Sequence, residues 1–304
     1  MRAVLTRWWD SDVMWSWRHT PVAVCATVLF VLLMVGSLGA GWIAPHNPFD
    51  LASVNLIDAL LPPAWEEGGT RNYLLGTDSQ GRDLYSALLY GTRVSVLIGL
   101  AAVVLSMLIG VGLGLLSGYA GGRLDAFIMR VADVQLSFPA ILIALLIDGV
   151  ARAAVPAGQH DSIAFPVLVG AIALAGWPQY ARTVRGSTLV EKSREYVQAA
   201  RVIGVPSLVI MFRHVLPNVM GPVMVLATVH LATAIITEAT LSFLGVGVPP
   251  TSPSLGTLIR VGNDFLFSGE WWITIFPGAA LVLLVLSVNL LGDWLRDALN
   301  PRLN

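Results

Sequence analysis

Six long apolar stretches decide what this chain of 304 residues can fold into. A helix needs about 20 apolar residues to cross the roughly 30 Å of hydrocarbon in a bilayer. The chain is 56% hydrophobic and only 12% charged, with a mean hydropathy of +0.74, which is typical of an integral membrane protein. We therefore expect one all-α transmembrane domain with six membrane-spanning helices, at residues 22–44, 94–116, 134–150, 163–180, 215–244 and 273–291.

The third and fourth stretches are the shortest and could instead form one re-entrant pair. We favour two separate spans because residues 151–162 between them are polar enough to form a loop. In the fifth stretch, Pro217, Gly221 and Pro222 predict a broken or kinked start.

The arginine and lysine residues indicate how the chain is oriented. With six spans, thirteen of the 18 basic residues fall on the side that holds residues 1–21, 119–133, 181–214 and 292–304, and five fall on the other. Cytoplasmic segments carry the excess of basic residues, so both termini are predicted to be cytoplasmic. Loops 45–93 and 245–272 are then external.

The first apolar stretch follows a basic segment, so a cleaved signal peptide is an alternative to a span. Its apolar core is longer than that of a signal peptide, and no small-residue cleavage site follows it. We expect a retained helix, preceded by a cytoplasmic interfacial segment at residues 1–21 that holds Trp8, Trp9, Trp15 and Trp17.

Small residues mark one face of the second span. Gly110, Gly114 and Gly118 repeat at intervals of four residues. Such a face lets two helices approach closely in lipid, so we expect helix packing here, with a pore-lining role as the alternative.

Most intramembrane polar groups lie in the fifth span. His230, Thr233, Thr237 and Thr240 are spaced by 3, 4 and 3 residues and share one helical face, with Glu238 beside it. Polar groups in a membrane interior line a water-filled path or bond across helix contacts. The sequence therefore predicts a translocation path here, and a hydrogen-bonded packing role stays open for each of these residues.

Patterns of catalytic residues are missing from the chain. It has no Walker A, H-E-x-x-H or G-x-S-x-G pattern, one cysteine and five scattered histidines. We expect no catalytic, cofactor or metal site. A net charge of −1 gives no reason to expect a nucleic acid partner.

The predicted cytoplasmic loop 181–214 contains a short polar helix at residues 195–202. Gly204 is expected to end it, and Pro206 suits the first turn of a second helix. Ala199 and Ala200 form a ridge of small side chains that could fit a groove on another protein. The alternative is a solvated connector.

The stretch "QAARVIGVPSLVIMFRHVLPN" resembles the cytoplasmic EAA loop of permease subunits in binding-protein-dependent ABC importers. Ala199, Ala200, Gly204, Leu216 and Pro217 match its spacing, whereas Gln198 replaces the motif glutamate and His214 a hydrophobic residue. Longer stretches narrow the resemblance to the second permease of dipeptide, oligopeptide and nickel-type importers, over roughly residues 74–303: "LLGTDSQGRDLYSALLYGTRVSVLIG", "GYAGGRLDAFIMRVADVQLSFPAILIALL", "TEATLSFLGVGVPPTSPSLGTLI" and "FPGAALVLLVLSVNLLGDWLRDALNPRL".

The resemblance implies half of a type I importer in a bacterial inner membrane. Its partners would be a second, related permease, two ABC ATPase subunits that bind ATP and Mg²⁺, and an extracytoplasmic solute-binding protein. The cargo would be short peptides, with a nickel chelate or a glutathione-like compound as alternatives. An alternative from a different functional class is a secondary transporter or channel that works without an ATPase. Such a protein would be expected to have internal repeats or several intramembrane charges, and the sequence shows neither.

The resemblance also assigns expected roles to two further groups of residues. The loop at residues 181–214 would dock on the ATPase through Glu195, Gln198, Ala199, Ala200, Arg201, Gly204 and Pro206. The external loops are candidates for contact with the receptor or the substrate, through Asp78, Arg82, Asp83, Arg260 and Asp264. For Arg260 and Asp264 we favour solvation of surface charges over such a contact. A short helix is expected at residues 83–90, ended by Gly91.

Overall fold

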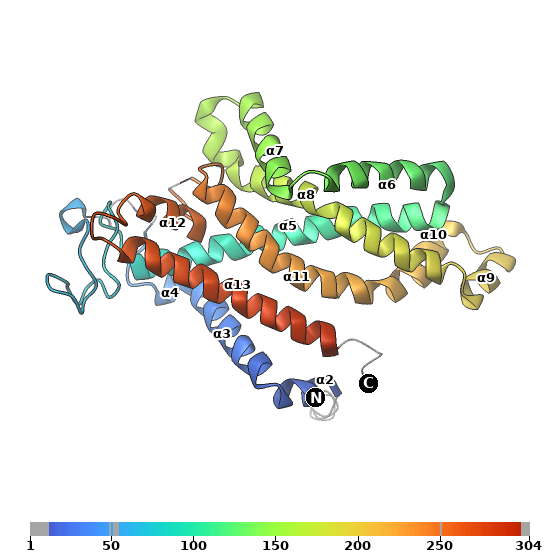
Figure 1. The fold of residues 1–304 in the computed structure, drawn as a ribbon, viewed down its shortest axis with the longest axis horizontal. Helices are drawn as coiled ribbons and strands as arrows, with labels where there is room; N and C mark the ends of the chain where they lie inside the picture. Colours follow the sequence, from blue (N-terminus) through green and yellow to red (C-terminus); the bar gives the residue numbers. More distant parts are fainter. Residues whose placement is uncertain (1–11, 49, 51–54, 250, 299–304) are drawn as a thin grey trace.

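The computed structural model describes residues 12–48, 50, 55–249 and 251–298. The described part is helical, apart from loops and one isolated bridge between Thr77 and Asp83. Figure 1 shows an elongated bundle of long helices, with α3 inclined to the others. These are α3 (Pro21–Leu38), α5 (Leu84–Ala120), α8 (His160–Glu191), α11 (Leu216–Phe243) and α13 (Trp272–Ala298).

Shorter elements decorate this bundle. The additional α-helices are α2 (Asp12–His19), α4 (Ala40–Ile43), α6 (Gly122–Leu136), α7 (Ala140–Ala154), α9 (Glu195–Val202), α10 (Ser207–Val209) and α12 (Leu255–Asn263). Two 3₁₀ turns, η1 (Leu56–Asp58) and η2 (Ala157–Gln159), and one π-helix, η3 (Ile210–Val215), complete the set.

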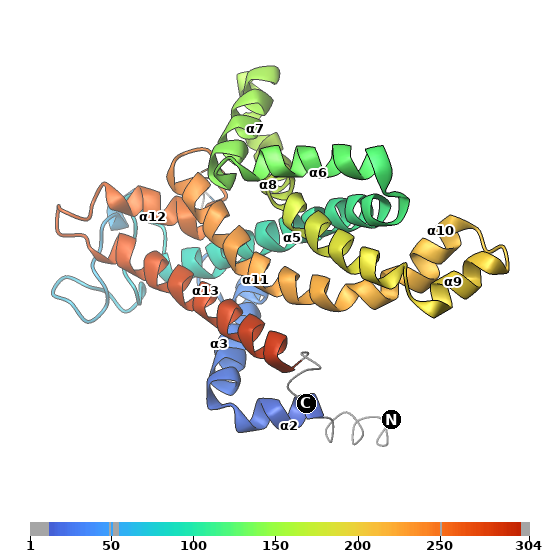
Figure 2. The same ribbon diagram turned by 45° about the vertical axis from the view of Figure 1, so that its right-hand side comes forward.

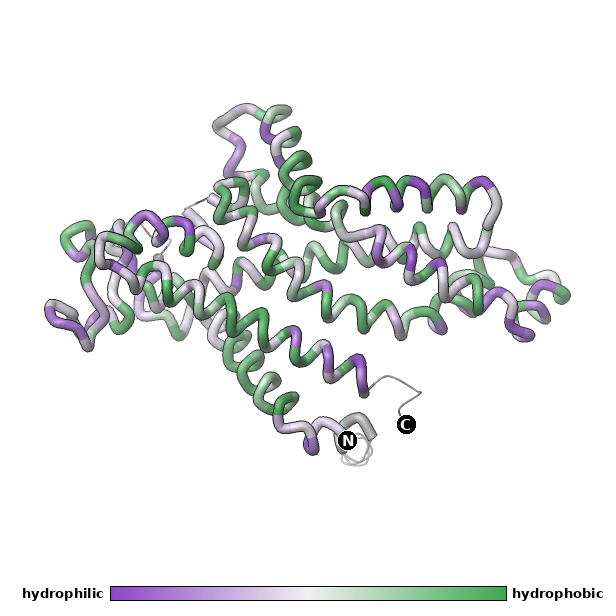
Figure 3. The backbone as a smooth tube through the Cα atoms, viewed as in Figure 1, coloured by the Kyte–Doolittle hydropathy of each residue, from purple (hydrophilic) through white to green (hydrophobic). Residues whose placement is uncertain are grey.

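The two ends of the bundle carry different elements. In Figures 1 and 2, α9 and α10 project from one end, and α12 lies at the opposite end beside the loop that precedes α5. Figure 3 shows hydrophilic residues concentrated around α9 and in the loops of the opposite end, with hydrophobic residues along the long helices between them. We call these the α9 end and the α12 end.

The most extensive helix contact in the described part joins α5 to α8. The glycine face predicted in the second span lies in this contact. A Cβ at Gly114 would lie 2.5 Å from the carbonyl oxygen of Ala181, and one at Gly110 would lie 2.4 Å from Cβ of Tyr180. The packing interpretation is therefore confirmed, because only bare backbone fits at these positions.

The third predicted span, 134–150, is wrong as a single straight helix. The chain forms α6 and α7 instead, bent by 96° at the break between them. Pro139 explains the break, since it has no backbone N–H and forces Phe138 out of helical conformation. Within the described residues, five single helices are long and apolar enough to span a membrane, and the bent pair makes up to six.

Several predicted boundaries also differ from the structure. Helix α8 continues to Glu191, so the loop at the α9 end begins later than residue 181. At the start of the fifth span the helix changes type before the predicted break, in the π-helix Ile210–Val215, and Pro222 sits inside a continuous α11.

Gly91 does not end a short helix, because α5 runs on from Leu84 to Ala120 without interruption. A Cβ at Gly91 would lie 3.1 Å from Leu258 of α12, so this glycine allows a close helix contact. Asp83 begins α5, where its carboxylate accepts a hydrogen bond from the Ser86 backbone N–H at 2.9 Å.

Candidate functional site

The loop at the α9 end forms the predicted helix–glycine–helix element. Helix α9 covers Glu195–Val202, and Gly204 follows it with a φ of +82°, a conformation that favours glycine. Pro206 then stands at the N-cap position of α10, one residue before the first turn in which it was predicted. The predicted local structure is confirmed.

One face of α9 packs against its own chain. Val197 and Ala200 share this face with a spacing of three residues, and Ala200 is only 3% exposed. Both belong to one apolar cluster with Ile210, Met211 and Val215. The predicted ridge is therefore wrong at Ala200, which faces inward, while Ala199 is exposed.

The exposed side of this loop is more apolar than the alanine ridge suggested. Val202 is 87% exposed and Ile203 is 78% exposed, and Leu208 is also exposed. The polar and small residues predicted to dock lie on the exposed side as well: Glu195, Gln198, Arg201, Gly204 and Pro206. Sequence reasoning missed the apolar pair, although two large aliphatic residues directly before the glycine that ends a polar helix were a usable signal. We call Val202, Ile203 and Leu208 the apolar tip.

Side chains tie the loop to the neighbouring long helices. The Gln198 amide donates to the Lys192 carbonyl at 3.1 Å, a bond that a glutamate in this position could not make. The Tyr196 hydroxyl donates to Glu191 at 2.7 Å and accepts from Asn218 at 3.1 Å, so it joins the end of α8 to the start of α11.

Burial, followed by the hydrogen bond to Glu191, raises the pKa of Tyr196 to about 12. The phenol therefore stays neutral and remains a hydrogen-bond donor at physiological pH. The loop is attached to two long helices of the bundle.

The structure divides the polar set predicted in the fifth span. Thr233 is exposed on α11, and Thr237 and Thr240 are half-buried. Each of the three donates to the backbone carbonyl four residues earlier, at 3.3, 2.8 and 2.8 Å. Together with Ile236 they form an incompletely covered strip of α11, which we call the threonine strip.

His230 and Glu238 lie away from the threonine strip. His230 is buried, and its Nδ1 lies 3.1 Å from the Tyr180 hydroxyl of α8. Glu238 is fully buried, and its two carboxyl oxygens accept from Ser95 at 2.8 Å and from Ser242 at 2.7 Å. Both residues make contacts within this chain.

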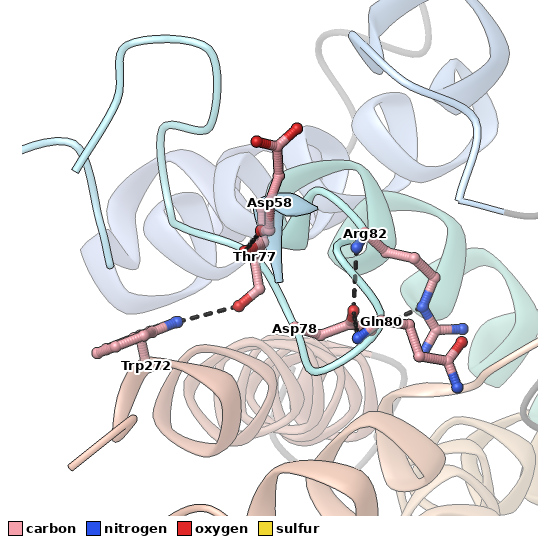
Figure 4. Close-up of polar contacts among 6 residues, drawn as sticks. All are labelled: Asp58, Thr77, Asp78, Gln80, Arg82 and Trp272. Carbon is pink, nitrogen blue, oxygen red and sulfur yellow. Dashed lines mark hydrogen bonds and ion pairs between the residues drawn. The ribbon is translucent and has the colours of Figure 1, made fainter. Parts of the chain in front are cut away.

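At the α12 end, three of the predicted receptor-facing residues are buried. Asp78, Arg82 and Asp83 form part of the loop interior, and Asp78 is only 1% exposed. Figure 4 shows the reason: the Asp78 carboxylate accepts from the backbone N–H groups of Gln80 and Arg82, and from Nε of Arg82 at 2.6 Å. The prediction that they face the receptor is wrong, because their hydrogen bonds build the turn.

This turn is fixed to the long helices on both sides. The indole N–H of Trp272, the first residue of α13, donates to the Thr77 carbonyl at 3.1 Å (Figure 4). Thr77 in turn donates its hydroxyl to the Asp58 carbonyl at 2.5 Å. On the other side, the Asp83 cap joins the turn directly to α5.

Arg260 and Asp264, one helical turn apart at the end of α12, remain exposed. They line a pocket of about 250 Å³ together with Ser79 of the turn and Thr257 of α12. We call it the outer pocket. An arginine and an aspartate at its rim suit a ligand or a protein surface that carries both charges.

Among the described residues, no three His, Cys, Asp or Glu side chains come together as the ligands of a metal ion would. The polar contacts of the bundle, such as Ser95 to Glu238 and Tyr180 to His230, join one helix to another.

Comparisons with known proteins agree on one family. The family model described as "Binding-protein-dependent transport system inner membrane component" matches residues 110–304. The chain is 40% identical to the di/tripeptide transport system permease protein DppC of Pseudomonas aeruginosa, over 95% of this chain and 90% of the relative. It is 43% identical to the dipeptide transport system permease protein DppC of Escherichia coli K12, over 92% and 89%.

A solved structure shares the fold. A chain of the MetNI methionine ABC transporter, solved in inward-facing conformations, matches with a TM-score of 0.55 at 20% sequence identity. The match covers 70% of this chain and 96% of that one.

Proposed function

The chain belongs to the family of binding-protein-dependent transport system inner membrane components, and from this premise we propose that it is the permease subunit of an ATP-driven importer of short peptides. The observation that carries the peptide cargo is the identity of 40% or more to dipeptide and di/tripeptide permeases along nearly the whole chain. The chain itself moves the substrate, and separate ATPase subunits hydrolyse ATP with Mg²⁺.

The α9 end is the proposed site of ATPase docking, on the cytoplasmic side. Its exposed helix–glycine–helix element carries the apolar tip, which is the kind of side-chain set that a groove on a partner buries. The arginine excess on this side supports the orientation. Tyr196 and Gln198 hold the element to α8, so a push on the loop moves the bundle.

The threonine strip is the proposed lining of the translocation path. A hydroxyl that bonds to its own helix backbone adds polarity to a membrane helix without needing a partner on a neighbouring helix. An incompletely covered polar strip in a span suits a water-filled path shared with a second permease subunit. His230 and Glu238 are buried within this chain, which favours a packing role for them.

The outer pocket is the proposed contact for the solute-binding protein at the external face. Arg260 and Asp264 offer both signs of charge on one accessible helix end. The buried Asp78–Arg82 turn holds Ser79 beside them.

Purification of the tagged chain from its native membrane tests the assignment. We expect two ABC ATPases and a second permease to co-purify, and the matching binding protein to bind dipeptides and tripeptides. If the binding protein instead binds a nickel chelate or a glutathione-like compound and does not bind peptides, that compound is the cargo. Purification without any ATPase would contradict the importer assignment.

A further inference from the structure

Glu238 lies where three helices meet at the α12 end. It belongs to α11, it accepts from Ser95 of α5 at 2.8 Å, and it accepts from Ser242 one turn later at 2.7 Å. The Ser95 hydroxyl also accepts from the backbone N–H of Leu255, the first residue of α12, at 3.2 Å. One buried carboxyl group thus connects α11 to α5 directly, and the Ser95 hydroxyl extends the connection to the start of α12.

Close backbone packing supports the same junction. A Cβ at Gly256 of α12 would lie 2.3 Å from the carbonyl oxygen of Ala239, the residue after Glu238. Farther along α12, a Cβ at Gly262 would lie 2.6 Å from the backbone of Ile273 in α13. At Gly256 and Gly262, helix α12 therefore approaches the backbones of α11 and α13 more closely than a larger residue would allow.

The other end of α11 meets the loop that carries the apolar tip. Val215 of the π-helix, immediately before α11, packs in one cluster with Val197 and Ala200 of α9. Helix α11 then runs unbroken from Leu216 to Phe243. A single helix thus leads from the loop at the α9 end to the Glu238 junction.

From this arrangement we propose that Glu238 is a positioning residue that fixes α12, and with it the outer pocket, to α11. When the docking loop displaces α11, α12 and the outer pocket then move together with it. The proposal rests on the proposed function in one respect: the movement is transmitted from an ATPase to an external binding protein. Whether Glu238 holds α12 in place does not depend on that function.

A path-lining role for Glu238 has less support. Its carboxyl oxygens point at Ser95 and Ser242, and the residue is fully buried, whereas the threonine strip occupies the incompletely covered side of α11. The Glu238 carboxyl group is enclosed by α5 and α12, so it acts on transport by holding these helices in place.

The test uses the complete transporter, in lipid nanodiscs, with Glu238→Leu and Glu238→Gln. Leucine removes both acceptor oxygens at similar volume, whereas glutamine keeps one acceptor and adds two donors for the same serine hydroxyls. Ser287→Ala is the matched control, since Ser287 is equally buried but bonds only to Leu284 of its own helix.

Two readouts separate coupling from folding. The first is the distance distribution between spin labels at Asn263 of α12 and Arg93 of α5, both exposed, in a Cys25→Ser background. The second is the ATPase rate with and without binding protein loaded with peptide. For Glu238→Leu we expect a broadened distribution and a stimulated rate that falls by roughly 2- to 30-fold at an unchanged basal rate. We expect Glu238→Gln and Ser287→Ala to behave as the wild type.

A narrow distribution and full stimulation in Glu238→Leu would overturn the proposal. If that variant fails to insert, Ser95→Ala decides, because it removes only the hydroxyl between Glu238 and Leu255. A wild-type complex that no peptide-loaded binding protein stimulates would contradict the proposed function, and the spin-label distances would still test whether Glu238 fixes α12.

Discussion

The double substitution Val202→Asp, Ile203→Asp probes the apolar tip where ATPase docking is proposed. Both side chains are almost fully exposed, at 87% and 78%, so aspartate costs the isolated permease little folding free energy. In a complex the same two side chains would be buried. Full burial of an aliphatic side chain contributes about 1.5–3 kcal/mol, which gives about 3–6 kcal/mol for the pair when both side chains are fully buried.

Loss of even the lower limit would weaken binding by about 100-fold, and two buried carboxylates would add to the loss. We therefore expect the dissociation constant of the ATPase for nanodisc-embedded permease to rise at least about 100-fold. A titration of labelled ATPase measures it. Leu124→Asp on α6, which likewise replaces an exposed aliphatic side chain, is the control and should bind normally. Binding of the double variant within about threefold of the wild type would refute the docking surface.

Two further predictions concern packing and the departure from the EAA pattern. Gly114→Val places a Cβ within 2.5 Å of the Ala181 carbonyl oxygen and should lower the free energy of unfolding by about 1–3 kcal/mol. Gly112→Val is the control, because a Cβ there meets nothing within 4 Å. Thermal denaturation of the purified variants compares them, and equal stability would contradict the packing account. Gln198→Glu removes the donor to the Lys192 carbonyl and should cost about 1 kcal/mol locally, seen as several-fold faster hydrogen exchange in α9. Unchanged exchange would show that this bond does not hold the loop.

The long-range pattern of the fold could be predicted from hydropathy. Spans, the glycine face of α5 and the helix–glycine–helix loop all follow from local composition and periodicity. The break at Pro139 was also readable in principle, because a proline in an apolar stretch interrupts helical hydrogen bonding. It was missed because the hydropathy of residues 134–150 continues across it.

The candidate site was less predictable, since exposure depends on tertiary contacts. Ala199 and Ala200 look alike in sequence, but only Ala200 faces the cluster behind α9. Asp78 and Arg82 look like loop surface charges, but they are buried because they satisfy a turn. For Glu238, the partners Ser95 and Ser242 come from two helices, so only the folded chain shows that its carboxyl group is enclosed.

Uptake of a labelled dipeptide into proteoliposomes tests the central claim most directly. The permease pair, the ATPases and a peptide-loaded binding protein are reconstituted, and ATP is then added or withheld. We predict accumulation only when all components and ATP are present, and none with the Val202→Asp, Ile203→Asp double variant. ATP-independent uptake by this chain alone, driven by an ion gradient, would contradict the account.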